Sequence, residues 1–175
     1  MRVLKMSLAV GLFAVLAACG STSPSGSNGN GNGNGNGNGN GSSCNPASQG
    51  TLTATIDGAS FTALCVTATR STGGGITTIG IGSSSTTTSL GLAFTGSNTG
   101  TFTVANGTFN ALVQVLSSGA IWTASLVTAN SSGSITLTKN DATGATGTFF
   151  FTAVGTQGGA TGTKTVTNGT FSVTF

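Results

Sequence analysis

The sequence TLTATIDGASFTA, from Thr51 to Ala63, places an Asp57-Gly58 pair between two short runs in which apolar and polar residues alternate. Asp-Gly is a strong signal for a two-residue β-hairpin, because the type I′ turn needs a positive φ at both turn positions. This turn predicts an apolar face that pairs Ile56 with Ala59, Ala54 with Phe61, Leu52 with Ala63 and Gly50 with Cys65. The other face pairs Thr55 with Ser60 and Thr53 with Thr62. Such a two-faced pattern is typical of a half-buried sheet.

Three further turn signals predict hairpins by the same rule. A turn at Asn106-Gly107 pairs Val104 with Phe109, Phe102 with Ala111 and Gly100 with Val113, and leaves Thr103 and Asn110 outside. A weaker Ser118-Gly119 turn pairs Val115 with Trp122 and Val113 with Ala124. A turn at Asn168-Gly169 pairs Val166 with Phe171 and Lys164 with Val173.

Runs of Thr, Val, Ile and Phe separated by Gly, Asn and Ser predict further strands near residues 75–82, 88–95, 133–139 and 147–154. No stretch has the 3.6-residue apolar period of a helix. We therefore expect an all-β fold, either an antiparallel β-sandwich or a closed, barrel-like meander of hairpins. The expected core consists of Leu52, Ala54, Ile56, Phe61, Ile79, Ile81, Leu90, Leu92, Phe94, Phe102, Val104, Phe109, Val113, Val115, Trp122, Leu126, Ile135, Leu137, Phe149, Phe151, Val166, Phe171 and Val173. The same register places three further apolar residues on the opposite face, namely Leu112, Leu116 and Ile121. They are interpreted as an exposed patch, as a surface covered by a loop, or as scattered surface residues.

Composition divides the chain into three parts. Residues 1–18 combine a basic start with an apolar segment that is too short to span a bilayer, which is typical of a signal helix. After Cys19, residues up to 43 are small or polar and include an unbroken Asn-Gly alternation over residues 28–41, so residues 19–43 are expected to be a disordered tether. Residues 44–175 are enough for one β domain.

The residues Leu16-Ala17-Ala18-Cys19 resemble the bacterial lipobox, whose cysteine receives a diacylglyceryl group before the signal peptide is removed. The resemblance implies that the mature protein begins at a lipid-modified Cys19 and that a membrane is its first partner. Gly20 is not the aspartate that retains such proteins at the inner membrane, which favours the outer membrane. The alternative is an ordinary secretory signal with an unrelated cysteine.

Cys44 and Cys65 remain as a pair in an oxidising compartment. Cys44 lies just before the first strand, and the hairpin register places Cys65 on the core-facing side of its strand. We expect a disulfide between them, which would stabilise the domain by roughly 3 kcal/mol through restriction of the unfolded chain. Two free thiols or a redox pair are the alternatives, and the redox pair lacks the usual Cys-Xaa-Xaa-Cys spacing.

The chain has neither histidine nor tyrosine, and outside the leader its charged side chains are Asp57, Arg70, Lys139, Asp141 and Lys164. A Ser-His-Asp triad and a histidine-ligated metal site are excluded. No basic patch points to nucleic acid. We expect no cofactor, no bound metal and no enzymatic activity. A remote alternative is a hydrolase that uses Asp57 and Asp141 as a carboxylate pair.

The segment Ile56-Asp57-Gly58-Ala59-Ser60-Phe61 resembles the opening of a family of uncharacterised bacterial lipoproteins with a single antiparallel β domain. The resemblance continues through residues 133–139, the Gly-Thr-Phe motif at Gly147-Thr148-Phe149 and the Asn-Gly-Thr-Phe motif at residues 168–171. It covers most of residues 51–175 and is weaker over residues 73–99. It implies a compact antiparallel β domain with no assigned function, and its motifs say nothing about catalysis.

Together these observations predict a lipid-anchored protein of the cell envelope whose non-catalytic β domain is a structural or binding module. A glycan- or surface-binding, adhesin-like module is the alternative, and a groove at Leu112, Leu116 or Ile121 or a threonine face would favour it. The expected partners are the membrane, through the lipid on Cys19, and an envelope protein or a glycan, but not nucleic acid.

Overall fold

The computed structural model describes residue 44 and residues 47–104, 111–125 and 128–175. The expected signal helix, Cys19, the tether, the Asn106-Gly107 turn, Phe109, Asn110 and Leu126 lie outside the described residues. The described chain is all-β, as predicted, and contains no helix. Its strands are β1 (Gly50–Ile56), β2 (Ala59–Thr62), β3 (Cys65–Gly73), β4 (Ile76–Ser84), β5 (Thr88–Thr95), β6 (Gly100–Val104), β7 (Ala111–Ser117), β8 (Ala120–Ala124), β9 (Ser132–Asn140), β10 (Gly144–Gln157) and β11 (Thr163–Thr174).

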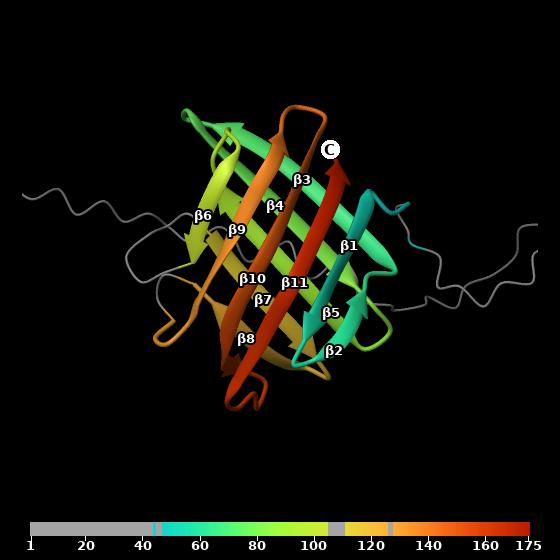
Figure 1. Cartoon of the computed structure of the whole chain (residues 1–175), viewed down its shortest axis with the longest axis vertical. Helices are drawn as coiled ribbons and strands as arrows, with labels where there is room; N and C mark the ends of the chain where they lie inside the picture. The colour runs from blue at the N-terminus through green and yellow to red at the C-terminus, as the bar shows by residue number, and fades with distance from the viewer. Residues whose placement is uncertain (1–43, 45–46, 105–110, 126–127) are drawn as a thin grey trace, which may run out of the picture. The chain divides into compact units, whose positions relative to one another are not determined.

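The strands form one antiparallel sheet that curls into a half-barrel (Figure 1). Its main strand order is β2-β1-β11-β10-β8-β7-β5-β4-β3. One edge of the long strand β10 serves two partners, since residues 145–152 pair with β9 and residues 154–157 pair with β8. The sheet divides at this edge. Figure 1 shows β6, β9, β10, β11 and β1 in front, with β3, β4, β5 and β7 crossing behind them.

Two of the predicted hairpins are confirmed, and both use the backbone conformation that their sequences favour. Asp57 and Gly58 have φ values of +48° and +84°, and β1 pairs with β2 in the predicted register from Thr53 opposite Thr62 to Ile56 opposite Ala59. Ser118 and Gly119 likewise have positive φ values, and the turn pairs β7 with β8 in the predicted register. The predicted strands near 75–82, 88–95, 133–139 and 147–154 correspond to β4, β5, β9 and β10.

The first hairpin register does not extend to Gly50 and Cys65. Strand β2 ends at Thr62, and β3 begins at Cys65 and pairs with β4 instead. Gly50 pairs with Val173 of β11. The break at residues 63–64 also reverses the alternation along the chain, so that Val66 is buried and the half-buried Cys65 lies on the other face. The expectation that Cys65 faces the core is therefore wrong.

The Asn168-Gly169 pair forms a β-bulge and not the predicted hairpin. Strand β11 runs through it without a turn, and its register against both β1 and β10 shifts by one residue at this point. Asn168 has a φ of +51°, a conformation that asparagine adopts more readily than most residues. This conformation accommodates the extra residue of the bulge. Val166 consequently pairs with Ile56 and Phe151 on the two neighbouring strands. The predicted pairs of Val166 with Phe171 and of Lys164 with Val173 are wrong, because all four residues lie on β11.

The predicted pairing of β6 with β7 is also wrong. Strand β6 pairs with β9, which places Gly100 opposite Leu137 and Phe102 opposite Ile135. Strand β7 has no edge left for β6, because β5 occupies one edge and β8 the other. Hairpin signals report the local turn preference, and competition between strand edges decides the pairing.

The core lies inside the half-barrel and agrees largely with the predicted set. The buried residues that were predicted are Leu52, Ala54, Phe61, Ile79, Ile81, Leu90, Leu92, Phe94, Val104, Val113, Val115, Ile135, Leu137, Phe149, Phe151, Val166, Phe171 and Val173. Ile56, Phe102 and Trp122 are only partly buried against this cluster. The core also contains residues that were not predicted, namely Val66, Ala68, Ala124, Ala145 and Ala153.

The seam of the half-barrel is closed by the segment that precedes β1. The Gln49 backbone N–H donates to the carbonyl of Val66 in β3 (2.8 Å), and the Gln49 carbonyl accepts from the Thr174 N–H of β11 (2.8 Å). At the same seam Cys44 and Cys65 form the predicted disulfide, with their Cα atoms 5.6 Å apart. The disulfide therefore encloses the β1–β2 hairpin and holds β3 beside it.

Candidate functional site

Asp57 lies in the β1–β2 turn and is engaged by β11. Its carboxylate accepts a 2.7 Å contact from Lys164 Nζ and a 2.8 Å hydrogen bond from the Thr165 N–H. Lys164 Nζ also lies 5.0 Å from the centre of the Trp122 ring, a cation–π contact at the edge of the core. Burial raises the pKa of Asp57, but the hydrogen bonds from Lys164 and Thr165 outweigh it, so the net pKa is lowered. This arrangement closes one end of the core.

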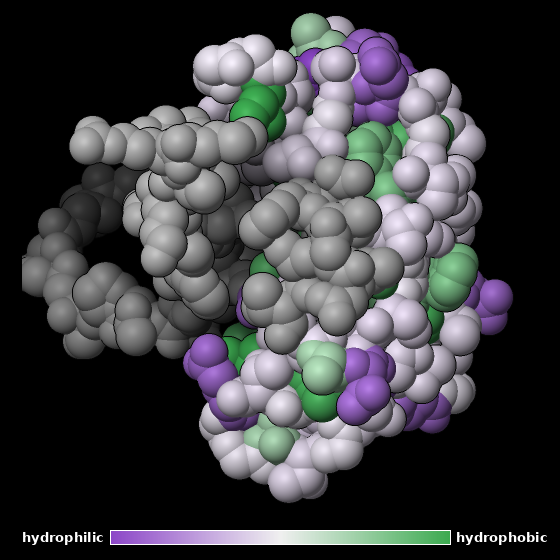
Figure 2. Space-filling view, turned by 90° about the vertical axis from the view of Figure 1, so that its left-hand side faces the viewer, coloured by the Kyte–Doolittle hydropathy of each residue, from purple (hydrophilic) through white to green (hydrophobic). Residues whose placement is uncertain are grey.

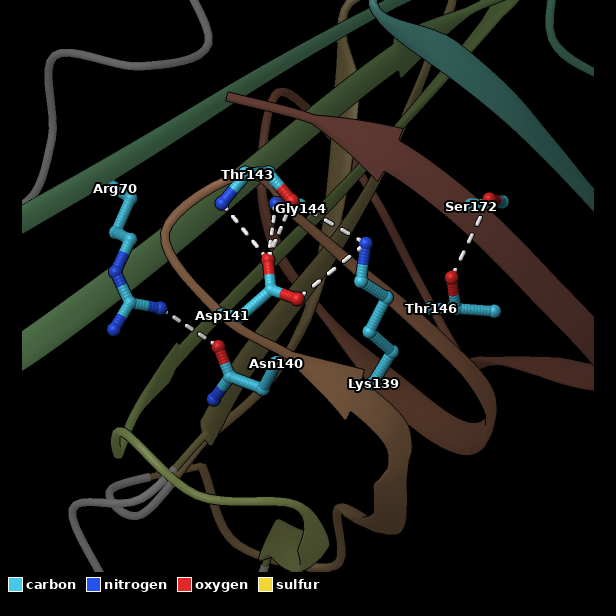
Figure 3. A network of polar contacts seen from close by, with 8 residues as sticks. All are labelled: Arg70, Lys139, Asn140, Asp141, Thr143, Gly144, Thr146 and Ser172. Carbon is cyan, nitrogen blue, oxygen red and sulfur yellow. Dashed lines mark hydrogen bonds and ion pairs between the residues drawn. The ribbon is translucent and has the colours of Figure 1, made fainter.

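Asp141 lies in the β9–β10 turn (Figure 3). Its Oδ1 atom accepts hydrogen bonds from the Thr143 hydroxyl (2.6 Å), the Thr143 N–H (2.8 Å) and the Gly144 N–H (3.1 Å). These hydrogen bonds, led by the Thr143 hydroxyl, lower the pKa of Asp141 from its ordinary 3.8 to about 2. Lys139 Nζ approaches the other carboxylate oxygen at 3.5 Å. The carboxylate is thus an ionised element of a turn.

Next to this turn, Arg70 reaches across from β3 and donates to Asn140 Oδ1 at 2.8 Å, as Figure 3 shows. Its guanidinium carbon lies 5.9 Å from the centre of the Phe175 ring. The amide of Asn140 in turn donates to the carbonyls of Gly96 and Asn98 in the loop between β5 and β6. A cation on an aromatic ring therefore closes this end of the core as well.

The two carboxylates lie at opposite ends of β11. Asp57 is bonded to Thr165, whereas the Asp141 turn is bonded to the chain at Phe175, ten residues further along. At about 3.3 Å per residue these points are roughly 30 Å apart. Glycoside hydrolysis needs carboxyl groups about 5–9.5 Å apart. The structure therefore does not bring together the pair on which the remote hydrolase alternative depends.

Metal ligands do not gather in the described part of the chain, where no three His, Cys, Asp or Glu side chains come together. The same residues include no helix of the length and apolarity that crossing a bilayer requires. Leu112, Leu116 and Ile121 are half-buried, beside the buried Gln114 and Thr123. They do not form the exposed patch that the sequence allowed.

The outer face of the front strands carries a continuous row of threonines. Each member lies opposite the next in the sheet register, and the row crosses six neighbouring strands: Thr62, Thr53, Thr170, Thr148, Thr136 and Thr101. All but the half-buried Thr136 are exposed. Hydroxyl groups bond along the row, between Thr53 and Thr170 (2.9 Å) and between Thr101 and Thr136 (3.1 Å). We call this set the threonine row.

Phe150 lies beside the threonine row and points outward. Its side chain is 58 % exposed, whereas its neighbours Phe149 and Phe151 are buried. The bulge of β11 lies next to it, and together they line an open depression formed by Thr148, Phe149, Phe150, Thr167, Asn168, Gly169 and Thr170. On the side of the molecule that Figure 2 shows, the described residues are mostly pale, the colour of threonine, serine and glycine, with hydrophilic residues in separate places. The depression therefore presents the apolar ring of Phe150 among uncharged residues, several of which carry hydroxyl groups.

Sequence reasoning placed the threonines outside but missed Phe150. The alternation of strand residues contained the signal, because Phe149 and Phe151 in the core require Phe150 to face the other way. The depression itself had no sequence signal, since it depends on the bulge at Asn168. Cys19, the predicted lipidation site, lies outside the described residues.

Comparison with known proteins gives one family. A family described as "Domain of unknown function (DUF6252)" matches residues 48–173, nearly the whole β domain. No curated protein and no solved structure matches the chain.

Proposed function

The chain belongs to the DUF6252 family of domains of unknown function, and from this premise we propose that it is a lipid-anchored protein of the bacterial cell envelope whose β domain is a non-catalytic binding module. The residues Leu16 to Cys19 support the anchor, through their resemblance to the lipobox. Residues 20–43 support an extended spacer, because they offer no apolar side chains with which to form a core. A Gly-rich coil of this length has a typical end-to-end distance of roughly 25 Å, which is the separation we propose between the domain and the membrane.

The distribution of charge in the β domain supports a binding role over catalysis. Lys164 is paired with Asp57, Lys139 with Asp141, and Arg70 with Asn140, so these groups stabilise the ends of the fold. The described surface between the two ends offers hydroxyl groups and one exposed aromatic ring. The observation that carries the proposal is this neutral outer face, on a domain that follows the lipobox-like residues and the Asn-Gly segment in the sequence.

The anchor is tested by detergent phase separation of cells that make the full-length protein or its Cys19→Ala variant. We expect the native protein in the detergent-rich phase, because two or more acyl chains give firm membrane attachment. The Cys19→Ala variant should move to the aqueous phase or accumulate with its signal peptide uncleaved. Native protein found in the aqueous phase would contradict the proposal.

An adhesin-like module on the cell surface is a second candidate function, favoured by the exposed Phe150. Protease treatment of intact cells tests the exposure that this candidate requires, because an Asn-Gly segment without apolar side chains is expected to be a good substrate for a broad protease. Release of the β domain into the medium would support the adhesin. Protection until the outer membrane is opened would exclude it and leave an envelope-protein partner in the periplasm.

A further inference from the structure

We propose that the depression at Phe150 and Asn168 binds a neutral polysaccharide chain that lies along the threonine row. The inference rests on the proposed function and names the class of ligand for its binding module. It begins with Phe150, one of the three large apolar side chains that are at least half exposed among the described residues, with Leu64 and Ile76. An exposed aromatic ring in the middle of a sheet face loses the free energy that burial would give it.

The ring has the surroundings of a sugar platform. The face of a pyranose ring presents C–H groups, which stack on an aromatic face, while its rim presents hydroxyl groups. Thr148, Thr167 and Thr170 supply hydroxyl groups around the depression, and Asn168 supplies an exposed amide. Hydroxyl and amide groups both donate and accept hydrogen bonds, as sugar hydroxyls do. A largely apolar surface with a few oriented polar groups is the usual composition of a ligand site.

The β11 bulge creates the depression. Asn168 takes the left-handed conformation, with φ +51°, so the extra residue is accommodated without interrupting β11. Gly169, beside it, has no side chain and is covered by the Phe149 ring. The bulge therefore exposes the two consecutive residues Thr167 and Asn168 beside Phe150 and leaves a hollow where a regular strand would present a continuous ridge.

The absence of charge at the depression and the length of the threonine row indicate the class of ligand. The residues that line the depression are all uncharged, and the ion pairs Lys164–Asp57 and Lys139–Asp141 are at the two ends of the sheet. An acidic polymer finds no counter-charge at the depression, so a neutral chain fits better. The threonine row spans six strands, about 24 Å at the usual strand spacing, so it offers hydroxyl contacts to several successive sugar units.

The test is a printed array of neutral and acidic oligosaccharides of increasing length, probed with the mature protein in a detergent that has no sugar headgroup. The neutral probes are gluco-, manno-, xylo- and chito-oligosaccharides, and the acidic probes contain uronate or sialate. We expect binding to at least one neutral series, with affinity rising with chain length and little changed by salt, since no ion pair contributes. Phe150→Ala should weaken that binding about tenfold, the size of an aromatic stacking contact.

Matched variants separate the site from a general loss of surface or stability. Ile76→Ala removes an equally exposed apolar side chain from β4 and should bind as the native protein does. Asn168→Gly keeps the positive φ and removes the amide, so it should weaken binding while the melting temperature stays the same. Thr51→Val, on the same face but outside the depression, is a second control.

Absence of binding to every neutral series would overturn the inference, and so would equal binding by native protein and Phe150→Ala. Binding confined to acidic probes and lost at high salt would also overturn it. None of these outcomes bears on the lipid anchor, because phase separation of the Cys19→Ala variant is read out independently. A failed anchor test with positive glycan binding would leave the ligand class standing and remove only the membrane attachment.

Discussion

Asp141 and Asp57 are the two acidic side chains of the sequence, and both stabilise turns. Asp141 accepts three hydrogen bonds from Thr143 and Gly144, and Asp57 joins the β1–β2 turn to β11 through Lys164 and Thr165. At the scale of residues, the binding role that we propose therefore falls to uncharged groups, among them the exposed ring of Phe150. The sequence allowed both aspartates to be read as a catalytic pair, because their separation in space depends on strand pairing and not on their neighbours in the chain.

The pH dependence of stability should come largely from these two carboxylates. A folded-state pKa of about 2 for Asp141, below its ordinary 3.8, means that its contribution is complete above about pH 4 and is lost as the pH falls toward 2. Asp141→Asn keeps the oxygen acceptor and removes the titration. We expect the variant to be less stable at pH 7 and to lose less stability between pH 4 and pH 2, as followed by thermal melting.

Asp57→Asn serves as the comparison, because the pKa of Asp57 is also lowered and its change should remove a further part of the acid dependence. Identical melting curves of Asp141→Asn and the native protein across pH 7 to 2 would show that the turn hydrogen bonds do not hold the ionised carboxylate.

At the scale of elements, the bulge in β11 brings Gly169 under the ring of Phe149. These residues lie directly opposite each other, and a Cβ atom at position 169 would overlap that ring. An aromatic side chain that covers a glycine on the neighbouring strand is a recognised way to fix strand register. The bulge thus positions both the core residue Phe149 and the outward depression at Asn168.

Gly169→Ala should destabilise the domain by about 1–3 kcal/mol, since the buried Phe149 has to leave its preferred position. Gly73→Ala is the matched control, because Gly73 has an ordinary φ and open space around the position of a Cβ atom. Chemical denaturation of both variants measures the difference. Equal stability of the two variants would show that Phe149 does not constrain the bulge.

The elements also show which signals in a sequence are local. Asp57-Gly58 and Ser118-Gly119 form turns in their predicted registers, because a type I′ turn is specified by its own two residues. Asn168-Gly169 has the same local preference but lies between two partner strands that keep β11 extended, so it becomes a bulge. The pairing of β6 with β9 could not be predicted from the sequence either, because it depends on which strand edges remain free in the folded sheet.

At the scale of the whole molecule, the half-barrel depends on the seam between β3 and the segment before β1. Backbone hydrogen bonds of Gln49 join the two sides, and the disulfide between Cys44 and Cys65 lies beside them. The disulfide could be predicted from a pair of cysteines that follows a segment resembling a secretory leader. The face on which Cys65 lies could not, because the break before β3 changes the alternation.

A Cys44→Ser, Cys65→Ser double variant should lose about 3 kcal/mol of stability under oxidising conditions, because the unfolded chain is no longer restricted by a 21-residue closure. Adding a reductant should bring the native protein down to the stability of the variant, as measured by thermal melting. If the two still differed by the same amount in reductant, side-chain packing at Cys65 would be responsible and the disulfide would not.

The most direct measurement on the central proposal is the mass of the N-terminal peptide of the mature protein, purified from membranes. A lipid-anchored module should yield a chain that begins at Cys19 and carries the added mass of a diacylglyceryl group, with or without a further acyl chain. A mature chain that begins at another residue, or at an unmodified Cys19, would contradict the lipid anchor and the placement of the neutral binding face in the cell envelope.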